Sequence, residues 1–303
     1  MGADRVRAVI ATSDRHIAQT EEWYTRPERG PDAVVDTLLG CAAELVASAN
    51  RSGAQVAAVG VSVHGVVDED SGVVEHGAAL GWSHTPVRAW TEEHIGLPVV
   101  VAHSLHAAAV AECRVGVGRP FERCALVSIG SGVGVAELRA GTLVRRGGAG
   151  VLDHRTTVGR DGRDDRDGEC TCGSRGCPAA LVSPQALVRR YAELSGGSGV
   201  RAWDLPLLAA CGDRPAAHVW RNAVDALAEV LAPVAARVGC LVIGGEAVRA
   251  GRAILRPLGS ALAERLPHRT RPELAVTGLG RGAAGLGAAL LAREARSVVS
   301  YAA

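Results

Sequence analysis

Lysine is absent from this chain, aromatic residues make up only 3% of it, and long uninterrupted apolar segments do not occur. All 33 basic residues are arginines, so mechanisms that need a lysine nucleophile or a P-loop lysine are excluded. No apolar run reaches the roughly 18–20 residues that a transmembrane helix needs, so no membrane partner is expected. The first residues lack the apolar core of a secretion signal, which predicts a cytoplasmic protein.

Net charge is low as well. The formal charge of +1 at pH 7 and the isoelectric point near 7.7 argue against a nucleic-acid binder that works through a broad basic surface. Apolar residues, by contrast, account for 48% of the 303 positions. A chain of this length can bury a sizeable core without disulfides or metal to compensate for small size.

The eight cysteines do not resemble a disulfide framework, because the chain is long and shows no secretion signal. Five of them stand alone in apolar stretches and are interpreted as small buried hydrophobic residues. These five are Cys41, Cys113, Cys124, Cys211 and Cys240.

The other three cysteines form the strongest chemical signal in the sequence. Cys170, Cys172 and Cys177 follow C-x-C-x4-C spacing around glycine turns, and His154 precedes them. Three thiolates and one imidazole make the closed, soft ligand set that structural Zn²⁺ prefers. We therefore expect a structural zinc site, the alternative being three unligated thiols on a loop.

Apolar strands alternate with amphipathic helices, which predicts an α/β protein in two lobes with a boundary near residues 116–118. The expected strands cover residues 7–12, 17–20, 56–63, 98–102, 124–129, 135–138, 143–144, 241–243 and 273–277. The expected helices cover residues 31–50, 107–114, 185–194, 205–210, 216–237, 247–266 and 283–292. Pro257 is expected to kink or break the helix that contains it.

Glycine-rich turns follow three of the expected strands, at 130–134, 244–245 and 278–282. Exposed backbone N–H groups in such turns can bind phosphate. Each turn alone is more often explained by ordinary packing, so their joint order carries more weight than any one of them.

Several of these segments together resemble the ROK family of repressors, open reading frames and sugar kinases. The resemblance rests on LPVVVAHSLHAAAVAE at 97–112, GVGR at 116–119, the turn at 130–134, GGAGVLDH at 147–154 and the cysteine element at 170–177. It continues through Gly244-Gly245 and the GAA helix near 285–289, so it covers nearly the whole chain. The cysteine element is its most specific part.

The resemblance implies a two-lobe, actin-like ATPase fold of the ribonuclease H type, with a ligand cleft between the lobes and a zinc-binding loop. It places residues 1–116 and 283–303 in an N-terminal lobe and 117–282 in a C-terminal lobe with the zinc element. In the family's kinases the cleft holds a hexose beside ATP and Mg²⁺. Gly130, Ser131, Gly132 and Gly134 would form the phosphate turn, and Gly244 and Gly245 the adenosine-side turn. The resemblance also implies a homodimer.

The departures from the family pattern lie at its sugar-binding positions. The aspartate that acts as general base is replaced by Ser104, whose hydroxyl has no useful basicity near neutral pH. Four more polar positions differ: Ala79, His103, Val151 and Ala179 occupy them. Of the same set, Gly65 and His154 match the family. Each lost hydrogen bond costs roughly 1–3 kcal/mol of ligand affinity, so an ordinary hexose is not the expected ligand.

The nucleotide side differs from the family pattern as well. The family begins with a strand and a D-x-G-G-T turn that holds phosphate and Mg²⁺, and this sequence starts inside that turn. The first strand and the metal-binding aspartate therefore lack counterparts, which weakens the expectation of ATP and Mg²⁺. This difference has three explanations: the natural chain starts further upstream, the chain is trimmed, or the sheet lacks that strand. The helix-turn-helix of the family's repressors has no counterpart in these residues, so the sequence predicts no DNA-binding element.

Three histidines lie at or beside the sugar-binding positions. His64 replaces a family proline, and His103 and His106 replace asparagines three positions apart. They are interpreted as polar filler residues, as a second metal or acid–base site, or as groups that recognise an anionic or aromatic ligand.

Three functions follow. The leading one is a non-catalytic, ligand-sensing or regulatory ROK-type protein with structural zinc and no sugar kinase activity. The alternative is an ATP-dependent sugar or amino-sugar kinase with a rearranged site and His103 as the nearest substitute base. The third is a repurposed enzyme that uses His64, His103 and His106 on another substrate.

Overall fold

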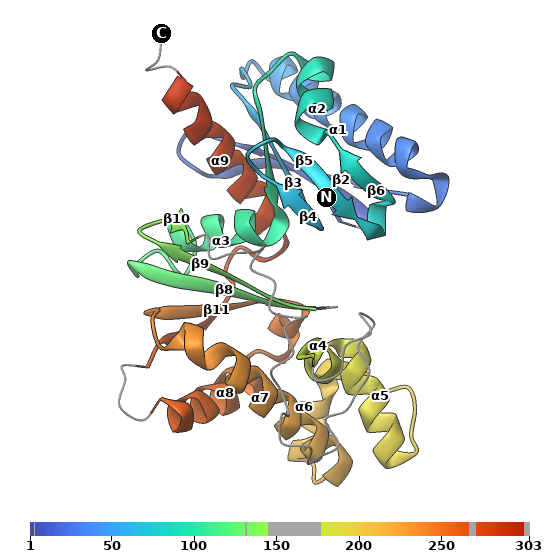
Figure 1. Cartoon of the computed structure of the whole chain (residues 1–303), viewed down its shortest axis with the longest axis vertical. Helices are drawn as coiled ribbons and strands as arrows, with labels where there is room; N and C mark the ends of the chain where they lie inside the picture. Colours follow the sequence, from blue (N-terminus) through green and yellow to red (C-terminus); the bar gives the residue numbers. More distant parts are fainter. Residues whose placement is uncertain (3, 131, 145–176, 267–270, 300–303) are drawn as a thin grey trace. The chain divides into compact units, whose positions relative to one another are not determined.

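The computed structural model describes residues 1–2, 4–130, 132–144, 177–266 and 271–299 (Figure 1). The chain divides into two compact units. Unit 1 comprises Met1–Val115 and Arg281–Ala303, and unit 2 comprises Gly116–Gly280. The two boundaries lie within two residues of those expected from the sequence.

In the described residues, unit 1 contains eleven regular helices and strands, ten of them between Met1 and Val115. Their bounds are β1 (Arg5–Ala11), β2 (Ile17–Tyr24), α1 (Pro31–Arg51), β3 (Val59–Val63), β4 (Val66–Asp68), β5 (Val73–Gly77), β6 (Trp82–Thr85), α2 (Val87–Ile95), β7 (Val99–His103) and α3 (Ser104–Arg114). The C-terminal helix α9 (Ala283–Val299) belongs to the same unit.

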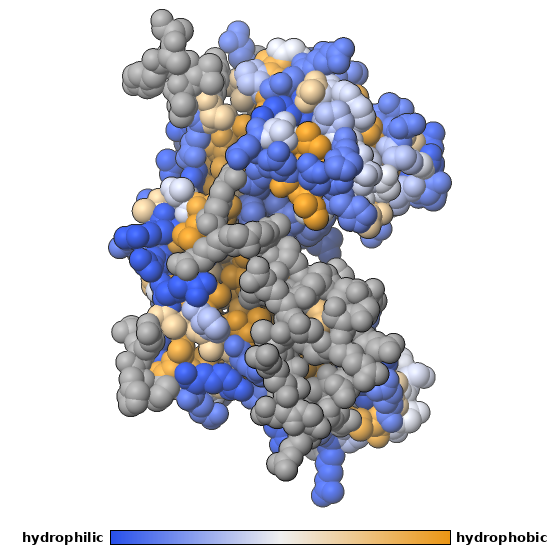
Figure 2. Space-filling view, viewed as in Figure 1, coloured by the Kyte–Doolittle hydropathy of each residue, from blue (hydrophilic) through white to orange (hydrophobic). Residues whose placement is uncertain are grey.

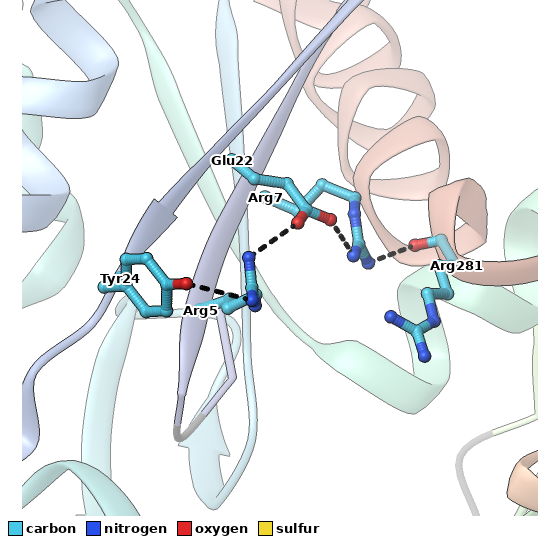
Figure 3. A network of polar contacts seen from close by, with 5 residues as sticks. All are labelled: Arg5, Arg7, Glu22, Tyr24 and Arg281. Atoms are coloured by element: carbon cyan, nitrogen blue, oxygen red, sulfur yellow. Dashed lines mark hydrogen bonds and ion pairs between the residues drawn. The ribbon is translucent and has the colours of Figure 1, made fainter.

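The β1–β2 hairpin is antiparallel and carries a network of polar contacts on its surface (Figure 3). Glu22 accepts hydrogen bonds from both Arg5 and Arg7, and Arg7 also donates to the carbonyl of Arg281 at 3.2 Å. Arg5 in addition donates to the Tyr24 hydroxyl at 3.3 Å and lies over its ring. These contacts join the hairpin to the segment that leads into α9.

A second pair of strands, β3 and β7, is parallel, and it packs against the small residues of α9. A Cβ atom on Gly60 would lie 2.1 Å from the Ala288 carbonyl oxygen, and one on Gly287 would lie 1.6 Å from that of Ala107. Glycine at these two positions therefore lets α9 approach β3 and α3 at backbone distance.

Three short strands, β4, β5 and β6, form an antiparallel meander that the sequence did not predict. Trp82 of β6 is 2% exposed, and its indole N–H donates to the Pro31 carbonyl at the start of α1. The meander therefore belongs to the same core as β3, β7 and α1.

Unit 2 is built on a five-stranded sheet of order β10-β9-β8-β11-β12. Its strands are β8 (Arg123–Ile129), β9 (Val133–Arg139), β10 (Thr142–Leu143), β11 (Cys240–Gly245) and β12 (Glu273–Val276). Strands β8, β11 and β12 are parallel neighbours, and β9 and β10 continue from β8 as antiparallel strands.

Five helices of unit 2 lie in the described residues. They are α4 (Ala179–Val182), α5 (Pro184–Ser195), α6 (Leu205–Ala210), α7 (Arg214–Ala235) and α8 (Arg252–Arg265). Figure 1 shows α7 and α8 together on one side of the sheet, where they bury a large apolar core with β8 and β11. All members of that core belong to unit 2.

Most expected elements are present, helices α2 and α4 were not expected, and three further differences concern strand β3, helix α8 and Cys211. Strand β3 begins at Val59 rather than at Val56. The predicted helix at 247–266 is interrupted at Gly251, where the backbone has φ +49°, and α8 then runs through Pro257 without a break. Cys211, expected to be buried, is exposed at the end of α6, whereas Cys41, Cys113, Cys124 and Cys240 are buried as expected.

Among the helices in the described ranges, none combines the length and the apolar character that a bilayer-crossing segment requires.

Candidate functional site

The carboxyl ends of the parallel strands β3 and β7 place the predicted histidines next to each other. Val63, the last residue of β3, is in register with His103, the last residue of β7, and His64 follows directly. Helix α3 begins at Ser104 and carries His106 in its first turn. Ligands of α/β proteins bind outside the carboxyl ends of parallel strands, so the position suits a binding site.

The three imidazole rings form one cluster. The ring centroids of His103 and His64 are 5.9 Å apart, and those of His103 and His106 are 5.2 Å apart. His103 is the buried member at 6% exposure, His106 is half-buried, and His64 is exposed to solvent.

His103 also caps α3. Its Nδ1 accepts a hydrogen bond from the backbone N–H of Leu105 at 3.2 Å, which places the ring proton of the neutral form on Nε2. Burial, followed by the neighbouring imidazoles of His106 and His64, lowers the pKa of His103 to about 4. The ring is therefore neutral at physiological pH and is a weak base. Protein atoms around the His64 ring desolvate it although part of its surface stays exposed, and this desolvation, followed by the Met1 ammonium group, lowers its pKa as well.

Glu69 joins the cluster, although the sequence analysis did not single it out. Its Oε1 accepts the backbone N–H of His103 at 2.8 Å and lies 2.8 Å from Nδ1 of His106. The side chains of Glu69 and His106 are only 14% and 15% exposed. The available signal was the acidic run Asp68-Glu69-Asp70, which also fits an ordinary charged turn.

Gly65 connects His64 to β4 in a conformation that excludes other residues. Its φ is +134°, and a Cβ atom there would lie 2.3 Å from the His76 carbonyl oxygen. Ala79, predicted to be near the ligand, is exposed in a short 3-10 turn between β5 and β6. Within the described residues, no group of three or more His, Cys, Asp or Glu side chains is arranged to hold a metal ion.

Unit 2 brings its glycine turns to one edge of the sheet. Gly130, Gly132 and Gly134 follow β8, and Gly244 and Gly245 end the adjacent parallel strand β11. The backbone N–H of Gly130 donates to the Gly132 carbonyl at 2.9 Å, which closes a tight turn. A Cβ atom on Gly245, whose φ is +74°, would lie 2.4 Å from the Ile129 carbonyl oxygen. The third turn follows β12, the next parallel strand.

The sequence profile of the ROK family matches residues 1–295. The chain belongs to the ROK family. It is 30% identical over 265 residues to a glucokinase of Streptomyces coelicolor, covering 87% of this chain and 75% of that protein. Among solved structures, the ROK hexokinase of Thermus thermophilus matches with a TM-score of 0.83 at 27% identity, covering 98% of this chain and 97% of the other.

Regulators of the ROK family share the fold. A transcriptional regulator described as a homologue of the Escherichia coli MLC protein matches with a TM-score of 0.82 at 21% identity, over 96% of this chain and 76% of that one. The fold is thus the actin-like two-lobe ATPase fold that ROK sugar kinases and repressors have in common.

Some predicted ROK site residues lie outside the described residues: Ser131, Val151, His154, Cys170 and Cys172. Of the predicted zinc ligands, only Cys177 is described, and its side chain is fully buried beside Ala179 and Ala180. Ala179 is 4% exposed at the start of α4, so its methyl group packs inside unit 2. The zinc site stays a prediction.

Proposed function

We propose that this ROK protein binds a small-molecule ligand beside the histidine cluster and does not phosphorylate it, as a ligand-sensing, transcription-regulator-like domain. The observation that carries the proposal is the position of Ser104. It occupies the place that the family resemblance gives to the catalytic aspartate, and it starts α3 directly after the neutral ring of His103. Neither group can accept a proton efficiently from a sugar hydroxyl at neutral pH.

The nearby carboxylate of Glu69 is not a simple substitute for the family's catalytic aspartate. Oε1 of Glu69 already interacts with the backbone of His103 and with the ring of His106. Using this carboxylate as a base would disrupt contacts that order the end of β7 and the start of α3. The arrangement therefore supports recognition better than proton transfer.

Loss of polar groups at Ala79 and Ser104 also argues against an ordinary hexose as the ligand. The neutral ring of His103 has only its Nε2–H left to donate, because Nδ1 already accepts from Leu105, so it suits a ligand with a few well-placed acceptors.

A binding screen tests this proposal. We expect at least one compound from a panel of sugars, sugar acids and aromatic metabolites to raise the melting temperature of the chain, and H64A to reduce that shift. Calorimetry with ATP and Mg²⁺ is expected to show no saturable binding. Saturable binding of both glucose and ATP with micromolar affinity would contradict the proposal.

A second function is favoured by one observation, the contact of 2.8 Å between Glu69 and His106. A carboxylate that pairs with Nδ1 of an imidazole orients the ring and leaves Nε2 to face a substrate, as in many hydrolytic sites. In a sugar kinase with a rearranged site, His106 would then be the base, in place of the His103 expected from the sequence. The kinase relatives support this alternative.

Variants of Glu69 and His106 distinguish a sugar kinase from a ligand-binding protein. A kinase that uses His106 would lose roughly 100-fold or more in kcat in H106N, with little change in KM. E69Q, which removes the carboxylate that orients His106, would also lower kcat, whereas H94N, in an exposed position of α2, serves as the control. A binding protein would show no activity in any of these chains.

We also propose the zinc site and the homodimer that the resemblance implies. The buried position of Cys177 is compatible with a thiolate ligand shielded from water. Zinc there would hold together the loop that contains His154, Cys170 and Cys172. Metal analysis should find one zinc per chain, lost in C172A and retained in C211A, whose cysteine is exposed at the end of α6. Equal zinc content in both variants, or none in the unaltered chain, would contradict the site.

A further inference from the structure

Arg88, in the first turn of α2, binds the turn that carries Glu69. Its Nη1 donates to the Asp70 carbonyl at 2.7 Å, and its Nη2 donates to the Glu69 carbonyl at 2.7 Å. The backbone N–H of Arg88 donates in addition to the Gly72 carbonyl at 3.1 Å. Three hydrogen bonds from one residue thus connect α2 to the turn between β4 and β5.

Gly72 allows the arginine side chain to come this close. The φ of Gly72 is +74°, and a Cβ atom there would lie 2.4 Å from Cβ of Arg88 and 2.8 Å from its Nε. Any larger residue at position 72 would therefore displace the arginine or the turn. The turn and the arginine of α2 fit each other at backbone distance.

The burial of Arg88 indicates that its side chain is held in this position. Most of the face of unit 1 drawn in Figure 2 is hydrophilic, so charged side chains on it can stay in water. Arg88 is half-buried instead, and its Nε is buried without a hydrogen-bond partner in the described part of the chain. Because burial of an unpaired polar group is unfavourable, the hydrogen bonds of Nη1 and Nη2 have to offset this cost.

The turn also has hydrogen bonds of its own. The N–H of Gly72 donates to the Asp68 carbonyl at 2.8 Å, and the Ser71 hydroxyl donates to the Asp68 carboxylate at 2.6 Å. These two bonds close the turn, but neither of them reaches α2 or β7. Strand β4, which leads into the turn, has only three residues and an irregular register with β5. Arg88 therefore supplies an attachment that closure of the turn does not.

Glu69 is held at its backbone and at its side chain. Arg88 binds its carbonyl, and its Oε1 accepts the N–H of His103 at 2.8 Å and lies 2.8 Å from Nδ1 of His106. An ionised carboxylate only accepts hydrogen bonds, so the contact with His106 requires a proton on Nδ1 and leaves Nε2 of the neutral ring without one. The position of Glu69 therefore decides which nitrogen of His106 can accept a hydrogen bond from a ligand.

We propose that Arg88 is a positioning residue of the histidine site, which holds the turn at residues 68–72 against α2 and so keeps Glu69 on His103 and His106. The inference rests on the proposed function, because it takes the histidine cluster as the ligand site. Arg88 acts through Glu69. Its guanidinium presents two donors in one rigid plane to two carbonyls, which the single ammonium group of lysine does not reproduce.

NMR of the full chain labelled with ¹⁵N-histidine tests the proposal without any ligand. At pH 8, where an ordinary histidine is neutral, the His106 ring should carry its proton on Nδ1, and E69A should shift this proton toward Nε2. R88M keeps the apolar stem without the donors and should give the E69A pattern, whereas R88K should give an intermediate one. The amide proton of His103 should exchange roughly 10-fold or more faster in R88M than in the unaltered chain.

S71A is the matched control, because it removes a hydrogen bond of the same turn that does not involve Arg88. It should leave the His106 pattern unchanged. The ring signals of His94, in an exposed position of α2, should be the same in every correctly folded variant. R88Q, which has an amide donor but no planar fork, is the second variant if R88M melts below the other chains.

Two results would overturn the proposal. One is a His106 pattern in R88M and R88Q that equals that of the unaltered chain. The other is an equal change in S71A, since closure of the turn would then be enough to position Glu69. A chain that binds no compound of the screen contradicts the proposed function, whereas the His106 pattern still decides the role of Arg88.

Discussion

His103 joins the end of β7 to the start of α3 and contacts two other imidazoles, so its protonation state couples the site to the stability of unit 1. Its ring accepts the Leu105 N–H through Nδ1, and this contact requires a nitrogen without a proton. Protonation would bring a positive charge into a nearly buried position beside two more imidazoles. The neutral form is therefore the one that the fold selects.

Because the folded chain favours the neutral ring of His103, we predict that its stability depends on pH. The pKa of His103 is about 4 in the folded chain, against 6.5 for an ordinary histidine. Above pH 6.5 both folded and unfolded states hold a neutral ring, and the stabilising effect is fully present. Between pH 6.5 and 4 the unfolded state binds the extra proton, so the free energy of unfolding falls, by up to about 3 kcal/mol.

Urea unfolding at several pH values measures this slope. H103N is the matched control, because asparagine caps helices well but does not titrate in this range. The variant should remove the part of the slope that belongs to position 103. An NMR titration that finds the pKa of His103 near 6.5 would contradict the predicted burial of a neutral ring.

Gly65 gives a second prediction at the residue scale. G65A places a methyl group 2.3 Å from the His76 carbonyl oxygen and requires φ +134°, so it should cost about 2–5 kcal/mol of unfolding free energy. G53A is the control, because φ there is +78° but nothing lies within 4 Å of the added Cβ. G53A should lower the free energy of unfolding by about 1 kcal/mol. If chemical denaturation gives the same loss for G65A and G53A, the His76 carbonyl does not crowd position 65.

At the scale of elements, an ion pair links Glu137 of β9 to Arg237, two residues after the end of α7. Arg237 donates from Nε to Glu137 at 2.7 Å and also donates to the Pro233 carbonyl. Only 9% of the Glu137 side chain is exposed. Removing one partner leaves the other charge partly buried and unpaired, which is costly.

E137A is therefore expected to lower the free energy of unfolding by about 2–3 kcal/mol. E122A removes the partner of Arg139 in a pair that is largely exposed, with 61% and 70% of the two side chains accessible, and should cost less than about 1 kcal/mol. Denaturant midpoints of both variants measure the difference. A larger loss in E122A would contradict the importance of burial.

Periodicity and apolar runs predicted most elements well, because helices such as α1 and α7 have long amphipathic patterns and β8 and β11 are buried on both faces. The β4–β6 meander was missed, since its strands are short and include charged and histidine residues. Strand β3 is shorter than its apolar run, because residues 56–58 pair with no described strand. Pro257 lies within α8, where only one backbone hydrogen bond is lost, and the chain turns at Gly251 instead.

The site was predicted in part. The sequence identified His64, His103 and His106 because they differ from a family pattern, and the structure brings their rings together. Glu69 could not be found in this way, because its role depends on a loop that folds back onto the end of β7. The choice between His103 and His106 as a base also needed the structure, since burial and capping are properties of the fold.

At the scale of the whole molecule, two units with separate apolar cores support two kinds of site. The histidine cluster belongs entirely to unit 1, and the glycine turns after β8 and β11 belong to unit 2. ROK relatives include sugar kinases and regulators with the same fold, so the fold alone does not decide between them. The side chains at the end of β7 therefore have to distinguish a sugar kinase from a regulator.

The most direct measurement is sugar phosphate formation by the purified chain at stoichiometric concentration, with ATP, Mg²⁺ and a panel of hexoses and N-acetylhexosamines, followed by mass spectrometry. The account predicts no product above that of the protein-free control, because Ser104 and the neutral His103 provide no effective base. Saturable, ATP-dependent formation of a sugar phosphate by the unaltered chain would contradict it.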